Sequence, residues 1–165
     1  MNYPENGAKG LNTAIDLFKQ AIQYDSTYST AYINLSTAYD HKGSYKDEMI
    51  ISNKLLLLTN NAPATLILRG ILFEKMNNID SAKKIYYLAK LENEKKLVTH
   101  PDDVHLIEQL IELNALTEGK DAAIKELNAQ VKMHPSLSSK LSYEYDFYKD
   151  FDRHAFIFGL TVETR

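Results

Sequence analysis

The 165-residue chain contains no cysteine and no tryptophan. Without cysteine it cannot form disulfides, use a thiolate nucleophile or bind zinc through sulfur. Its longest aliphatic run, Leu55 to Leu58, is too short to span a bilayer. The opening stretch MNYPENGAKG lacks the apolar core of a signal peptide. We therefore expect a soluble chain with no membrane insertion. The sequence leaves its compartment open: cytoplasmic, or periplasmic or surface-located if a leader has been removed.

The chain also has no excess of basic residues, and its formal net charge is -3. Binders of nucleic acid or anionic membranes need clustered lysine and arginine. The densest basic spots are Lys83-Lys84 and Lys95-Lys96, which we interpret as a solvated helix face. We therefore expect no nucleic-acid partner. Hydrophobic residues make up 44% of the chain, which suits one folded domain or a short array of repeated units.

Motifs that hold phosphates, zinc or calcium are absent, so we expect no cofactor and no metal. His100 and His105, with Asp102 and Asp103, are the best metal candidate, but their spacing does not put two ligands on one helical face. Helix capping explains the same residues. A second acidic cluster near the C-terminus fits a solvated turn better than a calcium site, and consists of Asp146, Asp150 and Asp152.

One constellation suits acid–base chemistry, namely His105, Glu108 and Glu112 at intervals of three and four along a helix face. Carboxylates on a helix surface are usually solubilising. An enzyme using these three residues is therefore a remote alternative, and we expect a protein that is not an enzyme.

What the sequence does contain is a repeat with a period of 34 residues. Three similar windows are LNTAIDLFKQAIQYD from Leu11, YKDEMIISNKLLLLT from Tyr45 and IDSAKKIYYLAKLEN from Ile79. Recurrence at such a period is typical of stacked helical units. Equivalent positions in the three windows are Ala14, Glu48 and Ala82, and then Ala21, Leu55 and Ala89.

The stretch GILFEKMNNIDSAKKIYYLAK, which runs from Gly70 to Lys90, predicts two short helices that pack together. Gly70 lets the facing helix come close, and Asn77-Asn78 makes the turn. Ala82 and Ala89 keep the second helix thin enough to nest against the first. Large residues at these alanines would cost about 1–3 kcal/mol through overpacking.

This pattern resembles the tetratricopeptide repeat family, whose unit is a 34-residue helix-turn-helix. In the unit from Pro63 the matching residues are Leu66, Gly70, Phe73, Ala82, Tyr86 and Ala89, and Arg69 departs from the pattern. In the unit from Ser29 the matches are Tyr32, Leu35, Ser36, Tyr39, Gly43 and Tyr45, and the departures are Glu48, Leu55 and Asn60. A fourth unit fits if its turn is one residue shorter, through Ile107, Leu110, Ile111, Ala123, Leu127 and Pro135. We expect Thr99 to be the N-cap at its start, with Pro101 early in the first turn.

The resemblance implies an all-α fold, a right-handed solenoid of antiparallel helix pairs forming an α-α superhelix. We expect a single domain that begins with a partial repeat consisting of a second helix only. Its parts are residues 8–28 (partial repeat), 29–62 and 63–98 (repeats), 99–135 (degenerate repeat) and 136–165 (C-terminal cap). Within the cap, the alternation of Tyr143, Tyr145 and Phe147 with acidic residues favours a β-hairpin, and a capping helix is the alternative.

The resemblance also implies a protein–protein interaction module that holds a peptide or partner segment in a concave groove. Carried over by position, the groove residues are Thr30, Ile33, Asn34, Thr37, His41, Ala64, Ile67, Leu68, Ile71, Glu74, His105, Glu108, Gln109 and Glu112. The basic residues with which some family members grip a peptide carboxylate are absent from this set. The alternative function is a non-catalytic structural subunit or accessory domain of a larger assembly, such as one in the cell envelope. The face carrying Ala14, Phe18 and Ala21 lacks its usual neighbour and predicts a homodimer contact.

Overall fold

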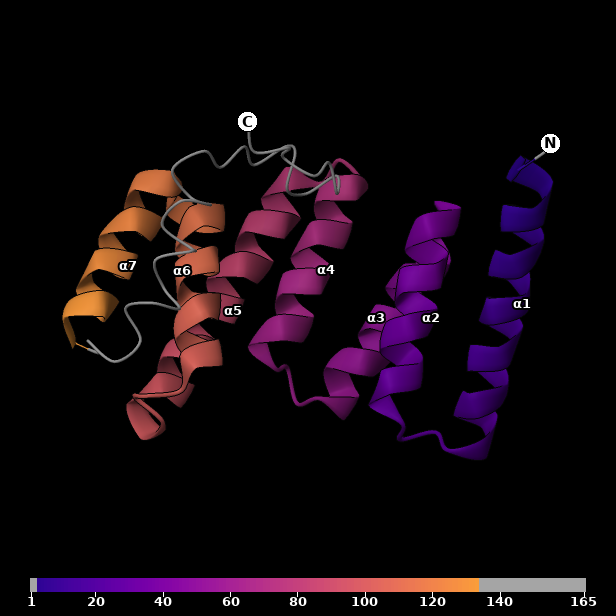
Figure 1. The fold of residues 1–165 in the computed structure, drawn as a ribbon, viewed down its shortest axis with the longest axis horizontal. Coiled ribbons are helices and arrows are strands. Elements are labelled where there is room, and N and C mark those ends of the chain that lie inside the picture. The colour runs from indigo at the N-terminus through magenta and orange to yellow at the C-terminus, as the bar shows by residue number, and fades with distance from the viewer. Residues whose placement is uncertain (1–2, 134–165) are drawn as a thin grey trace. The chain divides into compact units, whose positions relative to one another are not determined.

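In a computed structural model, residues 3–133 are described, and throughout that range the regular structure is helical, with no strand (Figure 1). The expected all-α class is thus confirmed for the described residues. The chain divides into two compact units, residues 1–61 and 62–165, which we describe separately. The predicted hairpin or capping helix at 136–165 lies outside the described residues. The helices are α1 (Tyr3–Tyr24), α2 (Ser29–Lys42) and α3 (Tyr45–Leu58), then α4 (Pro63–Lys75), α5 (Ile79–Thr99), α6 (Val104–Glu118) and α7 (Lys120–Met133).

The helix starts reproduce the period found in the sequence. The first helices α2 and α4 begin 34 residues apart, and so do the second helices α3 and α5. The α6–α7 pair follows at a longer interval, with its helices beginning at Val104 and Lys120. Helix α1 begins at Tyr3, several residues before the expected start, because the polar first residues continue the helix instead of preceding it.

The turns within the first two pairs also repeat. Gly43 and Asn77 both adopt the left-handed conformation, with φ of 69° and 59°. After α2, the Gly43 N–H donates to Asp40 and the Ser44 N–H donates to Tyr39. After α4, the equivalent bonds run from Asn77 to Glu74 and from Asn78 to Phe73. Glycine and asparagine are the residues that tolerate this conformation best, so both sequences end the first helix with the same hydrogen-bonded cap.

In the first unit, α1 and α2 share a small apolar core. Its buried members are Ile15 from α1 and Leu35, Ala38 and Tyr39 from α2. Half-buried side chains that pack against it are Leu11, Phe18, Ile22 and Ile51. The α1 members recur at intervals of three and four residues, which places them on one face of the helix.

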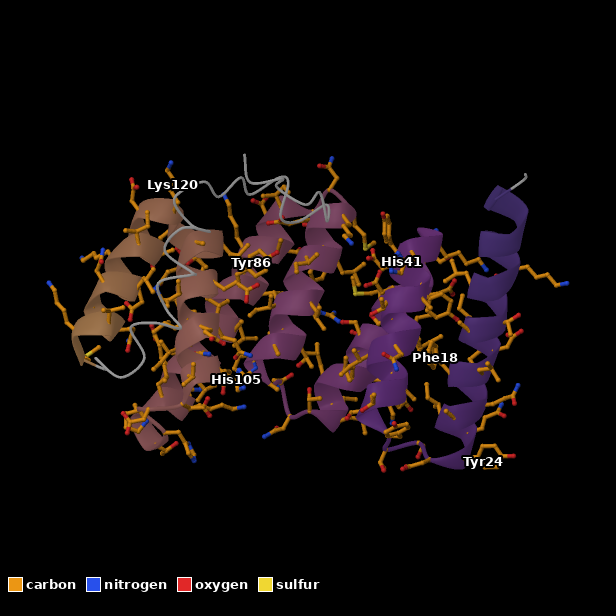
Figure 2. All side chains as sticks on the ribbon, in the orientation of Figure 1. Phe18, Tyr24, His41, Tyr86, His105 and Lys120 are labelled. Atoms are coloured by element: carbon orange, nitrogen blue, oxygen red, sulfur yellow. The ribbon has the colours of Figure 1, made fainter. Side chains whose placement is uncertain are left out.

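In the second unit, α4 and α5 approach each other closely at Gly70. A Cβ built on Gly70 would lie 2.6 Å from Cδ1 and 2.8 Å from Cζ of Tyr86, so only glycine leaves room for this ring. Tyr86, Ala82 and Ala89 are 0% exposed. Figure 2 shows Tyr86 on α5, and the contact with Gly70 places its ring against α4. The prediction that Gly70 and the two alanines let these helices nest is confirmed.

In the second unit, α4 and α6 both pack against α5. α4 and α6 also touch each other, and α7 packs on α6. The α6–α7 core consists of Ile107, Ile111, Ala115, Ala123 and Leu127. First helices therefore lie next to each other, with a second helix packed against both. This arrangement leaves one side of α4 and α6 turned away from α5.

The start of α6 differs from the prediction at its cap. The N-cap is Asp103, whose side chain accepts hydrogen bonds from the backbone N–H groups of His105 and Leu106 at 3.0 and 3.3 Å. Thr99 is the last residue of α5, where its hydroxyl donates to the carbonyl of Lys96. The expected threonine cap is wrong because α5 runs further than a 34-residue unit would allow.

Replacing Gly70 by alanine tests the close contact. The new Cβ would meet the Tyr86 ring, and overpacking should lower the free energy of unfolding by about 1–3 kcal/mol. Because alanine favours a helix over glycine, the substitution should also regain about 1 kcal/mol of the free energy of unfolding. Gly10→Ala is the matched control, because a Cβ at this exposed α1 position meets nothing within 4 Å and should stabilise. Denaturant unfolding measures both variants, and equal stabilisation by the two would contradict the contact.

The cap is tested by comparing three substitutions at the α5–α6 turn. Asp103→Ala should lower the free energy of unfolding by about 1 kcal/mol because two backbone N–H groups lose their acceptor. Asp103→Asn should be nearly neutral, since asparagine caps equally well. Thr99→Ala should have a smaller effect than Asp103→Ala. Thermal or urea unfolding measures the three stability changes. A larger loss for Thr99→Ala than for Asp103→Ala would show that Thr99 is the N-cap after all.

Candidate functional site

The five candidate residues on α2, in the first unit, are all exposed. Ile33 is the large apolar one, and 37% of its surface is accessible. It is accompanied by polar side chains one turn before and after, so the face is mixed in character. These residues are Thr30, Ile33, Asn34, Thr37 and His41.

The candidate residues on α4, in the second unit, divide into open and buried positions. Ala64 and Leu68 are exposed, with Leu68 46% accessible, and Ile71 is half-buried. Ile67 and Glu74 are buried, at 5% and 7%. The open positions follow the spacing i, i+4, i+7 and form one apolar stripe. This stripe lies away from Gly70, and therefore away from α5.

The candidate residues on α6 form the polar counterpart of this stripe. His105 is exposed, and Glu108, Gln109 and Glu112 are half-buried. The Nδ1 atom of His105 lies 3.4 Å from Oε2 of Glu108. The side-chain oxygen of Gln109 accepts a hydrogen bond from Nδ2 of the fully buried Asn93 on α5, at 3.2 Å. That bond places Gln109 at the edge of the stripe next to α5.

The geometry around His105 is that of a solvated surface pair. The side chain of His105 is 91% exposed, and Figure 2 shows it on α6. Catalytic pairs act in sites from which water is excluded. Among residues 3–133 the structure shows no group of three or more histidine, aspartate or glutamate side chains placed to hold a metal ion. Asp103, which was part of the metal candidate, uses its carboxylate to cap α6.

The open face of α1 differs from the expected one. Phe18 packs against the core shared with α2, whereas Leu17 and Tyr24 are 57% and 93% exposed. In Figure 2, Phe18 lies on the side of α1 that faces α2, and Tyr24 lies at the end of the helix. Phe18 therefore lies on the same side of α1 as Leu11, Ile15 and Ile22, and α2 covers it within the chain. The predicted homodimer contact through the face of Ala14, Phe18 and Ala21 stays a prediction.

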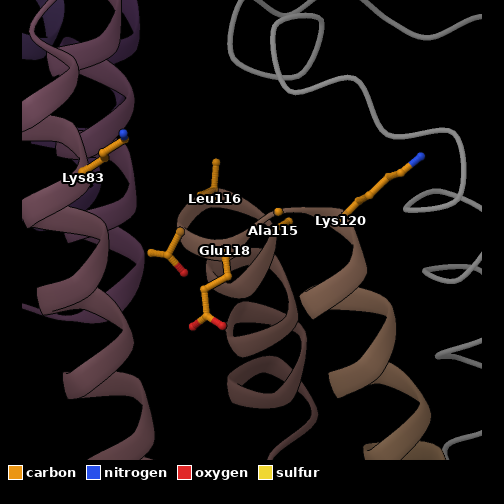
Figure 3. A pocket seen from close by; sticks show the side chains of 7 residues that line it. Lys83, Ala115, Leu116, Glu118 and Lys120 are labelled. Carbon is orange, nitrogen blue, oxygen red and sulfur yellow. The ribbon is translucent and has the colours of Figure 1, made fainter.

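A pocket that the sequence did not indicate lies at the α6–α7 turn. Its volume is about 390 Å³, and Figure 3 shows Lys83 beside it on α5 and Lys120 at the start of α7. The pocket brings together residues 37 positions apart in sequence, which no local motif reveals. Its lining consists of Lys83, Ala115, Leu116, Thr117, Glu118, Gly119 and Lys120.

Glu118, at the edge of this pocket, ties α6 to α5. Nζ of Lys90 donates a hydrogen bond to Oε1 of Glu118 at 2.5 Å. This hydrogen bond, together with the positive charge of Lys90, holds the pKa of the Glu118 carboxyl below its usual value. The Lys90–Glu118 ion pair and the Asn93–Gln109 hydrogen bond thus both link α5 to α6, at two separate positions along the helices.

Neither a protein-family model nor a curated protein matches the chain in comparisons with known proteins. Within residues 3–133, no helix combines the length and the apolar character needed to cross a membrane.

The Lys90–Glu118 pair predicts a pH-dependent contribution to stability. Because the pKa of Glu118 is lowered in the folded state, the contribution is present above the unfolded-state pKa and lost as pH falls through the folded-state pKa. Glu118→Gln should therefore be less stable than wild type at neutral pH and equal to it in acid. Salt should shrink the difference, since Glu118 is exposed. A stability difference between wild type and Glu118→Gln that stays constant as the pH falls would contradict a stabilising role of the ion pair.

Proposed function

We propose that this protein is a helical-repeat interaction module, similar to tetratricopeptide repeat proteins, that binds a peptide or partner segment on the open faces of its first helices. In the second unit this surface consists of the α4 stripe and the α6 stripe. We define the α4 stripe as Ala64, Leu68 and Ile71, and the α6 stripe as His105, Glu108, Gln109 and Glu112.

The observation that carries this proposal is the repeated turn. Helices α2 and α4 both end in a left-handed residue with the same pair of backbone hydrogen bonds, 34 residues apart. A shared turn at a shared period supports the repeat interpretation independently of side-chain resemblance. Repeat proteins of this kind bind through an extended surface formed by successive units.

The accessibility of the side chains is consistent with a recognition surface. Leu68 leaves almost half of its surface in water, although it lies among buried residues on α4. The α2 face of the first unit is accessible at every candidate position. Accessible apolar groups rimmed by polar ones are a common feature of interaction sites.

An architectural role is the second candidate, and a different surface favours it. Tyr87, Leu91 and Val98 on α5 are 54%, 50% and 83% exposed, and their spacing puts them on one face of that helix. A subunit packed permanently into a larger assembly would bury such a stripe.

The proposal is tested by selecting peptides from a random 12-residue display library on the immobilised full-length chain. Wild type should enrich a defined set of sequences. Leu68→Asp should lose them, because a carboxylate in the α4 stripe must be desolvated when a partner covers it. The matched control is Leu88→Asp on α5, where the leucine is 41% exposed, compared with 46% for Leu68.

Binding constants for the enriched peptides, measured by fluorescence anisotropy, give the outcome. We expect affinity to fall at least tenfold for Leu68→Asp and to be unchanged for Leu88→Asp. The opposite pattern would move the site to α5 and favour the architectural role. Failure of wild type to enrich any peptide would contradict the module. Circular dichroism checks that both variants remain folded.

A further inference from the structure

We infer that the surface formed by the α4 and α6 stripes recognises an extended segment that carries an aliphatic anchor and, a few residues away, a lysine or arginine. This inference rests on the proposed function and specifies the chemistry of its partner.

The aliphatic half of the specificity comes from α4. Its stripe presents Ala64, Leu68 and Ile71 over three successive turns, and none of these side chains is polar. Burying a leucine or isoleucine side chain of the partner against them would contribute about 1.5–3 kcal/mol. The stripe contains no donor or acceptor, so a polar partner side chain placed there would lose its hydrogen bonds to water.

The cationic half comes from α6. The side chain of Glu108 is 36% exposed, so its carboxylate is partly shielded from water and attracts a nearby cation more strongly than a fully solvated one. Glu112 follows one turn later on the same stripe, where its side chain already interacts with another group of the protein, so Glu108 is the main acidic position. The neighbouring His105 lies 3.4 Å from Glu108, and neither stripe contains a lysine or arginine. An acidic partner would meet like charge, whereas a basic one would meet its complement.

The contact between α4 and α6 sets the spacing of the two partner residues. Because these helices touch, their axes lie roughly 8–10 Å apart. An extended peptide advances about 3.3 Å per residue. A segment crossing from α4 to α6 should therefore place its cation about two to four residues from its aliphatic anchor.

The test uses the display selection on the full-length chain, followed by synthetic versions of the most enriched peptide. We expect enriched peptides to pair leucine, isoleucine or valine with lysine or arginine at this spacing. Exchanging the basic residue for glutamate should weaken binding about tenfold, and so should Glu108→Lys combined with Glu112→Lys. Glu108→Gln should give a smaller loss. The matched control is Glu94→Lys, on an exposed position of α5, which should leave affinity unchanged.

The outcomes separate this inference from the proposed function. Enriched peptides that need Leu68 but contain no basic residue, or that bind the Glu108→Lys, Glu112→Lys variant as well as wild type, would overturn the cationic specificity and leave the module intact. An absence of enrichment, or binding that ignores Leu68→Asp, would overturn the module itself. A charge-reversed variant that binds the glutamate-exchanged peptide better than wild type does would be the strongest support.

Discussion

The contact between Gly70 and Tyr86 is the constraint on which the second unit depends. It brings α4 so close to α5 that a single added methyl group would collide with the tyrosine ring. Gly70 allows α4 to approach α5 closely, and the small side chains of Ala82 and Ala89 are fully buried on α5. α5 also packs against α6. α4 and α6 then touch each other as well. The packing of the helices that carry the proposed surface thus depends on one glycine and two alanines.

Much of this architecture could be predicted from the sequence, because small residues and turn residues act locally. A glycine facing a large aromatic, alanines seven residues apart and paired asparagines each have few structural interpretations. They predicted the division of the 70–90 stretch into two helices and the turn at Asn77. The helical spacing of His105, Glu108 and Glu112 likewise predicted that these residues share one side of α6.

Other features could not be predicted because they depend on competition between neighbouring elements. Thr99 and Asp103 are both good caps, and only the length of α5 decides between them. Ile67, Leu68 and Ile71 are similar in chemistry, yet Ile67 is buried and Leu68 is exposed, and the helical period alone does not say which side of α4 is covered. The pocket at the α6–α7 turn joins Lys83 to residues far along the chain, which requires the fold itself.

The most direct measurement of the central claim is methyl-resolved NMR of the 18.8 kDa chain titrated with a selected peptide. We expect shifts for the methyl groups of Leu68 and Ile71, with the methyl groups of Leu88 and Leu91 on α5 unchanged. Shifts confined to the α5 methyl groups would contradict the claim, because the partner would then contact the second-helix side of the unit instead of the stripes on α4 and α6.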